Sequence, residues 1–303
     1  MHPIQPPSPG PDRRRRAAWT VTAATVAVLL AVAVVVGLVS AQSSRPATGR
    51  TLTVATWNMC GVKKWHCTGT GTPAAKQRSV RQLADDAGAR VIFLQEACSA
   101  DVASVRRQLG TDWRSAFHPY RWRGATGRLT PVHCAEARQG AAGIAILSAS
   151  RLTSVRTVAS KQPVVGLQRG ILCASVGAAR LTVCNAHLST AGADVAHPGW
   201  EYRDDQLREL TGAASGTRVV YGGDFNLEPP ARNRATAWIW PSSPFSAQRE
   251  CDQSSPDARS GQVTHVSGHK IDYLFTGLPR VRCTVRDTGN SDHYALLLRL
   301  RTG

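Results

Sequence analysis

The sequence predicts an α/β domain in which central mixed β-sheets are covered by helices. Short apolar segments typical of buried strands alternate with helical segments from residue 51 to the C-terminus. One neighbouring pair of strands has the spacing of a hairpin, which indicates mixed rather than purely parallel sheets. Polar residues directly follow several strands, so we expect them at the rim of the sheets.

The composition fits a globular chain with an apolar core. Of the 303 residues, 42% are hydrophobic and 19% are charged, which excludes collagen, a long coiled coil and a wholly disordered chain. There are 37 Lys and Arg against 20 Asp and Glu, giving a net charge of +17. Such a surface attracts phosphates, nucleic acid or anionic membranes. The arginines are scattered, however, and a general coding bias would produce the same count.

The N-terminal residues predict that the remainder of the chain is exported. Residues 1–16 are expected to form a disordered basic tail, because they are rich in proline and end in four arginines. Residues 17–39 are apolar and uncharged. A helix of that length, with a rise of ~1.5 Å per residue, reaches about 35 Å and can cross a bilayer. The preceding arginines should stay in the cytosol, which places the following residues outside.

We expect residues 17–39 to remain as a single-pass anchor in the cell membrane. Residues 40–50 then form a linker, and residues 51–303 form a domain outside the membrane. The alternative is a secreted protein, because Val39-Ser40-Ala41 resembles a signal-peptidase site and cleavage would occur near Ala41.

The eight cysteines agree with an oxidising compartment, since their number is even and all follow residue 59. Residues 171–176 and 181–186 are expected to form the hairpin, in which Cys173 and Cys184 face each other. A sequential scheme completes the pairing with three further disulfides: Cys60–Cys67, Cys98–Cys134 and Cys251–Cys283. The rival for the first pair is a zinc site of Cys60, His66 and Cys67, but the sequence offers no second half for it.

The remaining elements follow from apolar patterning. In the helix expected at residues 74–87, Val80, Leu83 and Ala84 share one face, and Gly88 follows its end. The other helices are expected at residues 101–109 and 202–210. The strands besides the hairpin are expected at residues 51–57, 91–94, 143–147, 218–221, 271–275 and 294–300. Residues 229–260 are rich in Pro, Ser and Arg and are expected to form a long loop over the site.

Six clusters of polar residues lie at the ends of expected strands. They are residues 56–59 (TWNM), 94–96 (LQE), 185–188 (NAHL), 222–226 (GGDFN), 270–273 (KIDY) and 291–293 (SDH). Each cluster alone has an ordinary structural explanation, such as a turn residue, a helix cap or a buried histidine. Six of them in one domain, each placed after or before an apolar strand, favour a shared pocket.

These clusters resemble the endonuclease/exonuclease/phosphatase superfamily, the DNase I-like proteins, in both residues and order. The GDFN and SDH motifs are the most specific, and the resemblance spans residues 51–300. It implies a four-layered α/β sandwich, with two packed mixed sheets flanked by helices. It also implies a divalent-metal-dependent phosphoesterase that uses in-line attack by water. Arg203 and Gln206 fit the helix that follows the HL motif of that family.

The resemblance also assigns roles to individual residues. Glu96 would be the principal metal ligand, with Asn58 beside it and Asp292 near the same ion. Asp224 would orient or deprotonate the attacking water. Asn226 would help to hold that water or the phosphate. His293 would contact the phosphate, with Asp272 as its orienting partner. His187 would stabilise the transition-state oxygens or act as general acid. Oxygen ligands of this kind suit Mg²⁺, with Mn²⁺ or Ca²⁺ as alternatives, rather than Zn²⁺.

Two departures from the family pattern matter. Cys60 stands where repair nucleases of the family carry an acidic residue, which argues against DNA repair. The family's tyrosine between the QE and HL motifs has Tyr120 as its candidate here, and Arg138 is a candidate phosphate contact.

The tryptophans have two interpretations. Trp113, Trp122, Trp200, Trp238 and Trp240 could stack on bases, but packing in the core or under loops is the commoner role. Trp122, between two arginines, is the best candidate for contact with nucleic acid.

Three functions are compatible with the sequence. The first is an extracytoplasmic nuclease, acting as a monomer, with nucleic acid as its phosphate-ester substrate; the basic charge favours it. The second is a surface phosphatase or phosphodiesterase acting on lipid-linked or small-molecule phosphates. The expected anchor at residues 17–39 favours it, because the anchor would hold the protein at the membrane. The third is an inactive binding module on the same scaffold, which the complete polar set disfavours.

Overall fold

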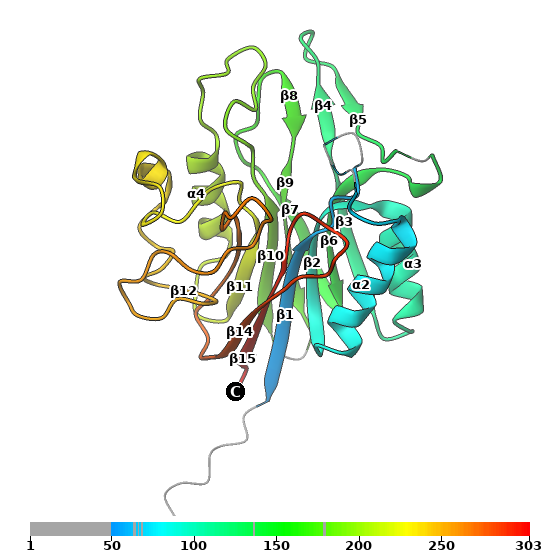
Figure 1. Ribbon diagram of the computed structural model, residues 1–303, viewed down its shortest axis with the longest axis vertical. Helices are drawn as coiled ribbons and strands as arrows, with labels where there is room; N and C mark the ends of the chain where they lie inside the picture. Colours follow the sequence, from blue (N-terminus) through cyan, green and yellow to red (C-terminus); the bar gives the residue numbers. More distant parts are fainter. Residues whose placement is uncertain (1–49, 63–64, 66, 68, 136, 178–179) are drawn as a thin grey trace, which may run out of the picture. The chain divides into compact units, whose positions relative to one another are not determined.

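Every strand and helix expected from residue 51 onward has a counterpart in the computed structural model (Figure 1). The structure describes residues 50–303 except 63–64, 66, 68, 136 and 178–179. The tail, anchor and cleavage site expected before residue 50 therefore lie outside the described residues. Among the residues that are described, no helix is both long and apolar enough to span a bilayer.

The first sheet has six strands and is mixed. Its order is β14 (Arg280–Arg286), β15 (Ala295–Arg301), β1 (Thr51–Asn58), β2 (Ala89–Cys98), β6 (Ala142–Ser148) and β3 (Arg114–Pro119). β1 runs parallel to β2 and antiparallel to β15, so the chain after Asp292 starts next to the end of β1.

The second sheet is also mixed and six-stranded. Its order is β12 (Arg249–Glu250), β13 (Asp272–Thr276), β11 (Val219–Asp224), β10 (Leu181–His187), β9 (Gly170–Val176) and β7 (Leu152–Val158). The parallel pair is β10 and β11. A small third sheet, which the sequence did not predict, consists of β5 (Leu129–Pro131), β4 (Arg121–Arg123) and β8 (Gly166–Gln168).

Alternating side chains on the central strands build the four layers. On β2, Val91 and Phe93 join the core between the sheets, whereas Ile92 and Leu94 join the core under the helices. The outer face of the first sheet is covered by α2 (Pro73–Asp85) and α3 (Ser99–Gln108). The outer face of the second sheet packs against α4 (Arg203–Ala213) and η3 (Arg234–Ile239). The four-layered sandwich is thus confirmed.

The elements that the sequence missed lie at exposed edges or in loops. β7 and β14 have mostly exposed or half-exposed side chains and therefore lack the continuous apolar run of a buried strand. The segment at residues 229–260 is a loop for most of its length, but it contains η3 and the short β12.

All four expected disulfides are present: Cys60–Cys67, Cys98–Cys134, Cys173–Cys184 and Cys251–Cys283. The register of β9 and β10 pairs Cys173 with Cys184, as the hairpin predicted. The zinc alternative is wrong, because two of its three ligands are consumed by a disulfide; the third, His66, lies outside the described residues. Cys251 and Cys283 join the second sheet to β14 of the first and thereby close the core between the sheets.

Candidate active site

Strand register brings three of the predicted residues into one row. His187 on β10 lies opposite Asp224 on β11, and Asp224 lies opposite Asp272 on β13. Neighbours in register point to the same face of a sheet, so all three side chains face the first sheet. On β1 of that sheet, Asn58 is the last residue.

The site lies where the core between the two sheets reaches the ends of β10 and β11. On β10 the inward positions run Val183, Asn185, His187, so the apolar side chain gives way to polar ones within one strand. β11 follows the same alternation from Val220 through Gly222 to Asp224. The polar residues at the strand ends are therefore continuations of the buried faces, which explains why Asn58, His187, Asp224, Asp272 and His293 are buried, whereas Glu96, Asn226 and Asp292 are half-buried.

The glycine pair before Asp224 is required by close strand packing. A Cβ at Gly222 would lie 1.9 Å from the carbonyl oxygen of Tyr273, and one at Gly223 would lie 1.9 Å from that of Ala186. Gly223 also has a positive φ of 129°, which favours glycine. Larger residues would push β10 and β13 away from β11 and separate His187 from Asp224.

A bulge turns Glu96 into the site. The pairing of β2 with β6 shifts between Leu94 and Ala97, and Glu96 has a φ of 49°. Its backbone N–H donates to the Tyr120 hydroxyl at 3.2 Å, and its carbonyl accepts from Gly61 at 3.0 Å. The bulge explains how Gln95 and Glu96, which are neighbours in sequence, both reach the interior.

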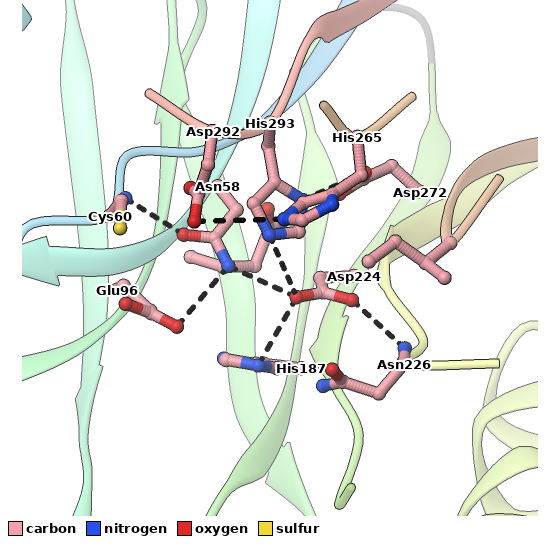
Figure 2. Close-up of polar contacts among 12 residues, drawn as sticks. Asn58, Cys60, Glu96, His187, Asp224, Asn226, His265, Asp272, Asp292 and His293 are labelled. Atoms are coloured by element: carbon pink, nitrogen blue, oxygen red, sulfur yellow. Dashed lines mark hydrogen bonds and ion pairs between the residues drawn. The ribbon is translucent and has the colours of Figure 1, made fainter. Parts of the chain in front are cut away.

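Asp224 is the centre of the polar network (Figure 2). Its Oδ2 accepts from Asn58 Nδ2 at 3.0 Å and lies 3.3 Å from His187 Nε2 and 3.8 Å from His293 Nε2. Its Oδ1 accepts from the backbone N–H of Asn226 at 2.9 Å. Burial raises the pKa of Asp224, partly offset by the positive charge of His293. A carboxylate in this setting is a stronger proton acceptor than an exposed one.

His293 is held as a cation. Its Nδ1 lies 2.9 Å from Asp272 Oδ2, and its backbone carbonyl accepts from Trp57 Nε1 at 3.1 Å. Burial lowers the pKa of His293, but the carboxylates of Asp272, Asp224 and Asp292 outweigh it and raise that pKa to about 10. The structure therefore places Asp272 and His293 in the contact that was expected from the sequence.

His187 has the opposite environment. Burial, with Arg169 and His293 as neighbouring cations, lowers its pKa well below the ordinary value, so the ring is neutral. Its Nδ1 lies 2.6 Å from the Tyr120 hydroxyl. The two histidines of the site thus differ in charge, and the chain Glu96–Tyr120–His187–Asp224 links both sheets.

Asp292 and Asn226 lie at the margins of the network. Asp292 Oδ2 is 3.6 Å from His265 Nε2; burial raises its pKa, but His265 and His293 outweigh this and hold the pKa below the usual range. Asn226 has a φ of 48° and donates through Nδ2 to the Leu188 carbonyl. Both predicted residues therefore join the site.

The donor set fits a hard divalent cation. In Figure 2 the carboxylates of Glu96 and Asp292 point toward the Asn58 side chain. Within the described part of the chain, no Lys, Arg or His forms an ion pair with Glu96, and burial raises the pKa of Glu96 to about 7. A cation beside this carboxylate would remove that penalty, and oxygen donors favour Mg²⁺. Other groups that could hold an ion are Asp224, Asp272 and His293, and His265, Asp292 and His293.

The Cys60–Cys67 disulfide borders this donor set. Cys67 Sγ lies 3.6 Å from Glu96 Oε2, and the Cys60 backbone N–H donates to Asn58 Oδ1 at 2.9 Å. The disulfide therefore occupies the place where repair-type relatives were expected to carry an acid, and it positions two predicted metal ligands.

Three residues of the site were missed or left open by the sequence, and a fourth, Arg203, was expected only from its place on the helix after the HL motif. Tyr120 was only a candidate and is fully buried in the network. Arg169, between β8 and β9, acts electrostatically on Glu96, Tyr120 and His187, and its buried Nε has no hydrogen-bond partner among the described residues. Arg203 donates to the Asn226 carbonyl at 2.6 Å. His265 pairs with the strand segment around His293, and no motif marks it.

The structure also locates Arg138 and the five tryptophans that were considered from the sequence. Arg138 lies on η2 (Ala137–Gln139) and lines a cavity with residues of α2 and α3. Trp113 and Trp240 are buried, whereas Trp122, Trp200 and Trp238 are exposed.

Comparisons with known proteins agree with this geometry. A sequence model described as the endonuclease/exonuclease/phosphatase family matches residues 55–293. Among curated proteins, no sequence matches the chain.

Several solved structures have the same fold. The chain is 19% identical to an endonuclease/exonuclease/phosphatase from Beutenbergia cavernae, with a TM-score of 0.57, covering 84% of this chain and 72% of the other. It is 14% identical to D. rerio TDP2 complexed with a single-strand DNA product (TM-score 0.54, 82% and 98% covered). It is 12% identical to the 3'-5' exonuclease NExo from Neisseria meningitidis (TM-score 0.56, 82% and 100% covered). At these identities the similarity concerns the fold.

The charge state of His293 is directly testable. Asp272→Asn should lower the pKa of His293 from about 10 more than Asp292→Asn does, because Asp272 is the carboxylate that raises it most. The measurement is NMR titration of the His293 ring in both variants. Equal shifts in the two variants would contradict the assigned pairing.

Proposed function

The chain belongs to the endonuclease/exonuclease/phosphatase family and is a hydrolase acting on phosphoester bonds; from this premise we propose that it is a divalent-metal-dependent nuclease that works outside the cytoplasm. The observation that carries the proposal is the position of Asp224, between a neutral His187, a cationic His293 and the amide of Asn58. Such a set can accept a proton from water and neutralise charge on a phosphate at the same point.

The residues of the chain divide the chemistry as follows. Asp224 accepts the proton of the attacking water, and Asn226 holds that water beside it. His293, oriented by Asp272, donates to the phosphate oxygens as their negative charge grows, and its imidazolium can give a proton to the leaving oxygen as the bond from phosphorus to that oxygen breaks. His187 donates from Nε2 to the same oxygens, with its ring fixed by Tyr120. Glu96, Asn58 and Asp292 would hold the divalent cation, which supplies further charge neutralisation at the phosphorus.

A basic hairpin beside the site favours a polyanionic substrate. Tyr120 leads directly into β4, and between Asp112 and Glu136 the sequence has arginines but no acidic residue. Arg121, Arg123 and Arg128 form no ion pair with any described carboxylate, and Trp122 between them is 43% exposed. Figure 1 shows β4 and β5 projecting beyond the sheets. Cations with an exposed aromatic ring are typical of surfaces that track a nucleic-acid backbone.

The alternative is a surface phosphatase or phosphodiesterase that acts on lipid-linked or small-molecule phosphates. The predicted anchor at residues 17–39 favours it, because such an anchor would keep the site near head groups. It would use the same Asp224 chemistry, and only the substrate would differ.

Loss of Asp224 tests the chemistry and the substrate together. We expect the full chain with Mg²⁺ to nick supercoiled plasmid and to cleave short single-stranded DNA, and we expect chelator to abolish both reactions. Asp224→Ala should lower the rate at least about 100-fold, since a positioned proton acceptor contributes that much or more. Phosphate release from phosphomonoesters or lipid head groups, with the DNA intact, would move the assignment to the alternative.

The hairpin arginines should govern salt sensitivity. Removing two cations that contact phosphates flattens the log–log dependence of binding on salt by roughly 0.7 per contact for a single strand. We expect this for Arg121→Gln combined with Arg123→Gln. The matched control is Arg282→Gln combined with Arg299→Gln, which removes the same charge from exposed positions on the first sheet. The same flattening in both double variants would mean that only net charge matters.

The location outside the cytoplasm is proposed from the sequence before residue 50 and from the four disulfides. Protease added to intact cells should digest the domain. In untreated cells, the protein should sediment with membranes and retain residues 17–39. A soluble form whose N-terminus starts near Ala41 would instead show secretion. Recovery of a reduced form from the cytosol would contradict both.

A further inference from the structure

A second hollow lies beside the site, on the side of α4. This cavity of about 650 Å³ is lined by three segments of the chain: residues 161–164, residues 199–205 and η3. Two tryptophans contribute to its lining, Trp200 and Trp238, and their side chains are 53% and 64% exposed. Single exposed apolar side chains are normal on a folded domain, but two large aromatic rings that line one cavity together mark a candidate binding surface.

The loop that carries Trp200 is rigid. The buried carboxylate of Asp194 accepts hydrogen bonds from the backbone of Val164 at 2.6 Å and Ala196 at 2.9 Å, and from the Tyr202 hydroxyl at 2.5 Å. Burial raises the pKa of Asp194, but these donors outweigh it and hold the pKa well below its usual range. The ring of His197 stacks on one face of Trp200, with 3.8 Å between centroids. Trp200 is therefore held in place by this stack while about half of its surface remains exposed.

A short chain of contacts connects the cavity to the active site. Glu201, in the cavity wall, pairs with Arg203 at 2.6 Å. Arg203 in turn donates to the carbonyl of Asn226, whose backbone N–H donates to Asp224. The cavity wall is thus connected to Asp224 through Glu201, Arg203 and the backbone of Asn226.

Glu201 and Asp205 in the cavity wall are closely paired with cations, Glu201 with Arg203 and Asp205 with Lys161 and Arg208, which leaves Asp204 as the carboxylate best placed to accept from a hydrogen-bond donor. Three carboxylates face it, on Glu201, Asp204 and Asp205, against one ammonium on Lys161. Lys161 is already paired with Asp205 at 2.7 Å. Asp204 has only a 3.7 Å contact to Arg208 among the described residues, so it can accept from a ligand.

We propose that this cavity receives an unpaired base of a single-stranded nucleic acid whose phosphodiester lies at Asp224. The inference rests on the proposed nuclease function and names its substrate class. A base offers a flat ring for Trp200 and Trp238 and, in adenine or cytosine, an exocyclic amine for Asp204. A base within a duplex cannot enter, because its faces are stacked and its amine is paired. An anionic bilayer is disfavoured by the three carboxylates.

The test compares substrates with and without bases. The full chain with Mg²⁺ is given short single strands of deoxyadenylate, of thymidylate, and of the same backbone with abasic residues. Trp200→Ala should raise KM for the base-bearing strand about 10-fold, in line with the strength of base–aromatic stacking, and leave the abasic strand unchanged. Asp204→Asn should reduce the preference for adenine over thymine. Val281→Ala, an exposed apolar truncation on β14, is the control.

The outcomes separate the cavity from the nuclease function. Equal effects of Trp200→Ala on base-bearing and abasic strands would overturn the inference while the nuclease function stands. If no strand is cleaved, the nuclease function fails; base-dependent quenching of tryptophan fluorescence by deoxyadenylate, lost in Trp200→Ala, would then still support a base site. If phosphatidylcholine vesicles change the tryptophan fluorescence of the full chain, the Trp200→Ala variant loses that change and its cleavage rate is unaltered, the cavity is a membrane contact and the inference is overturned.

Discussion

One buried amide fixes the relation between the two sheets, and the site depends on it. Asn185 on β10 of the second sheet donates to the carbonyls of Leu94 at 3.0 Å and Ala145 at 2.8 Å in the first sheet, and its Oδ1 accepts from Gln95 at 2.6 Å. A buried amide that loses such partners costs about 1–3 kcal/mol each, so this register is strongly preferred over a slipped one. Two residues farther along β10 stands His187, and one residue after Gln95 stands Glu96. The amide therefore sets the distance between the two halves of the site.

Burial of charge is the second constraint on the site. Asp224, Asp272 and His293 enter the interior together, and the single imidazolium offsets part of the charge of the two carboxylates. Glu96 forms no ion pair with a described residue, and burial raises its pKa to about 7 although His293 and Arg169 act against that rise. The fold therefore gathers more carboxylates than cations at the point where the metal ligands of the family are expected. The disulfide at Cys67 lies against the same carboxylate, which limits its movement.

The sequence predicted those parts of the fold whose signals are local. Strands buried on both faces, such as β2 and β10, appear as apolar runs, and the polar residues at their ends identify the site. β7 and β14 were missed because solvent covers much of their surface. Tyr120, Arg169 and His265 were missed, or left open, for a different reason: they reach the site from loops or short strands, through contacts between residues far apart in the chain. The bulge at Glu96 has no signature in the sequence either, since a positive φ at glutamate arises from its tertiary partners.

The net charge of +17 is an incomplete guide to what the site binds. The basic residues near the site are concentrated on the β4–β5 hairpin, while the cavity beside α4 is lined mainly by carboxylates and tryptophans. Figure 1 shows the β4–β5 hairpin and α4 on opposite sides of the sheet ends. A ligand with anionic and aromatic parts can satisfy both surfaces only in one orientation, with its phosphates toward the hairpin and its rings toward α4. For the proposed nuclease, this division of charge would be a better guide to the substrate than the total charge, because a polymer with phosphates and bases can contact both surfaces at once.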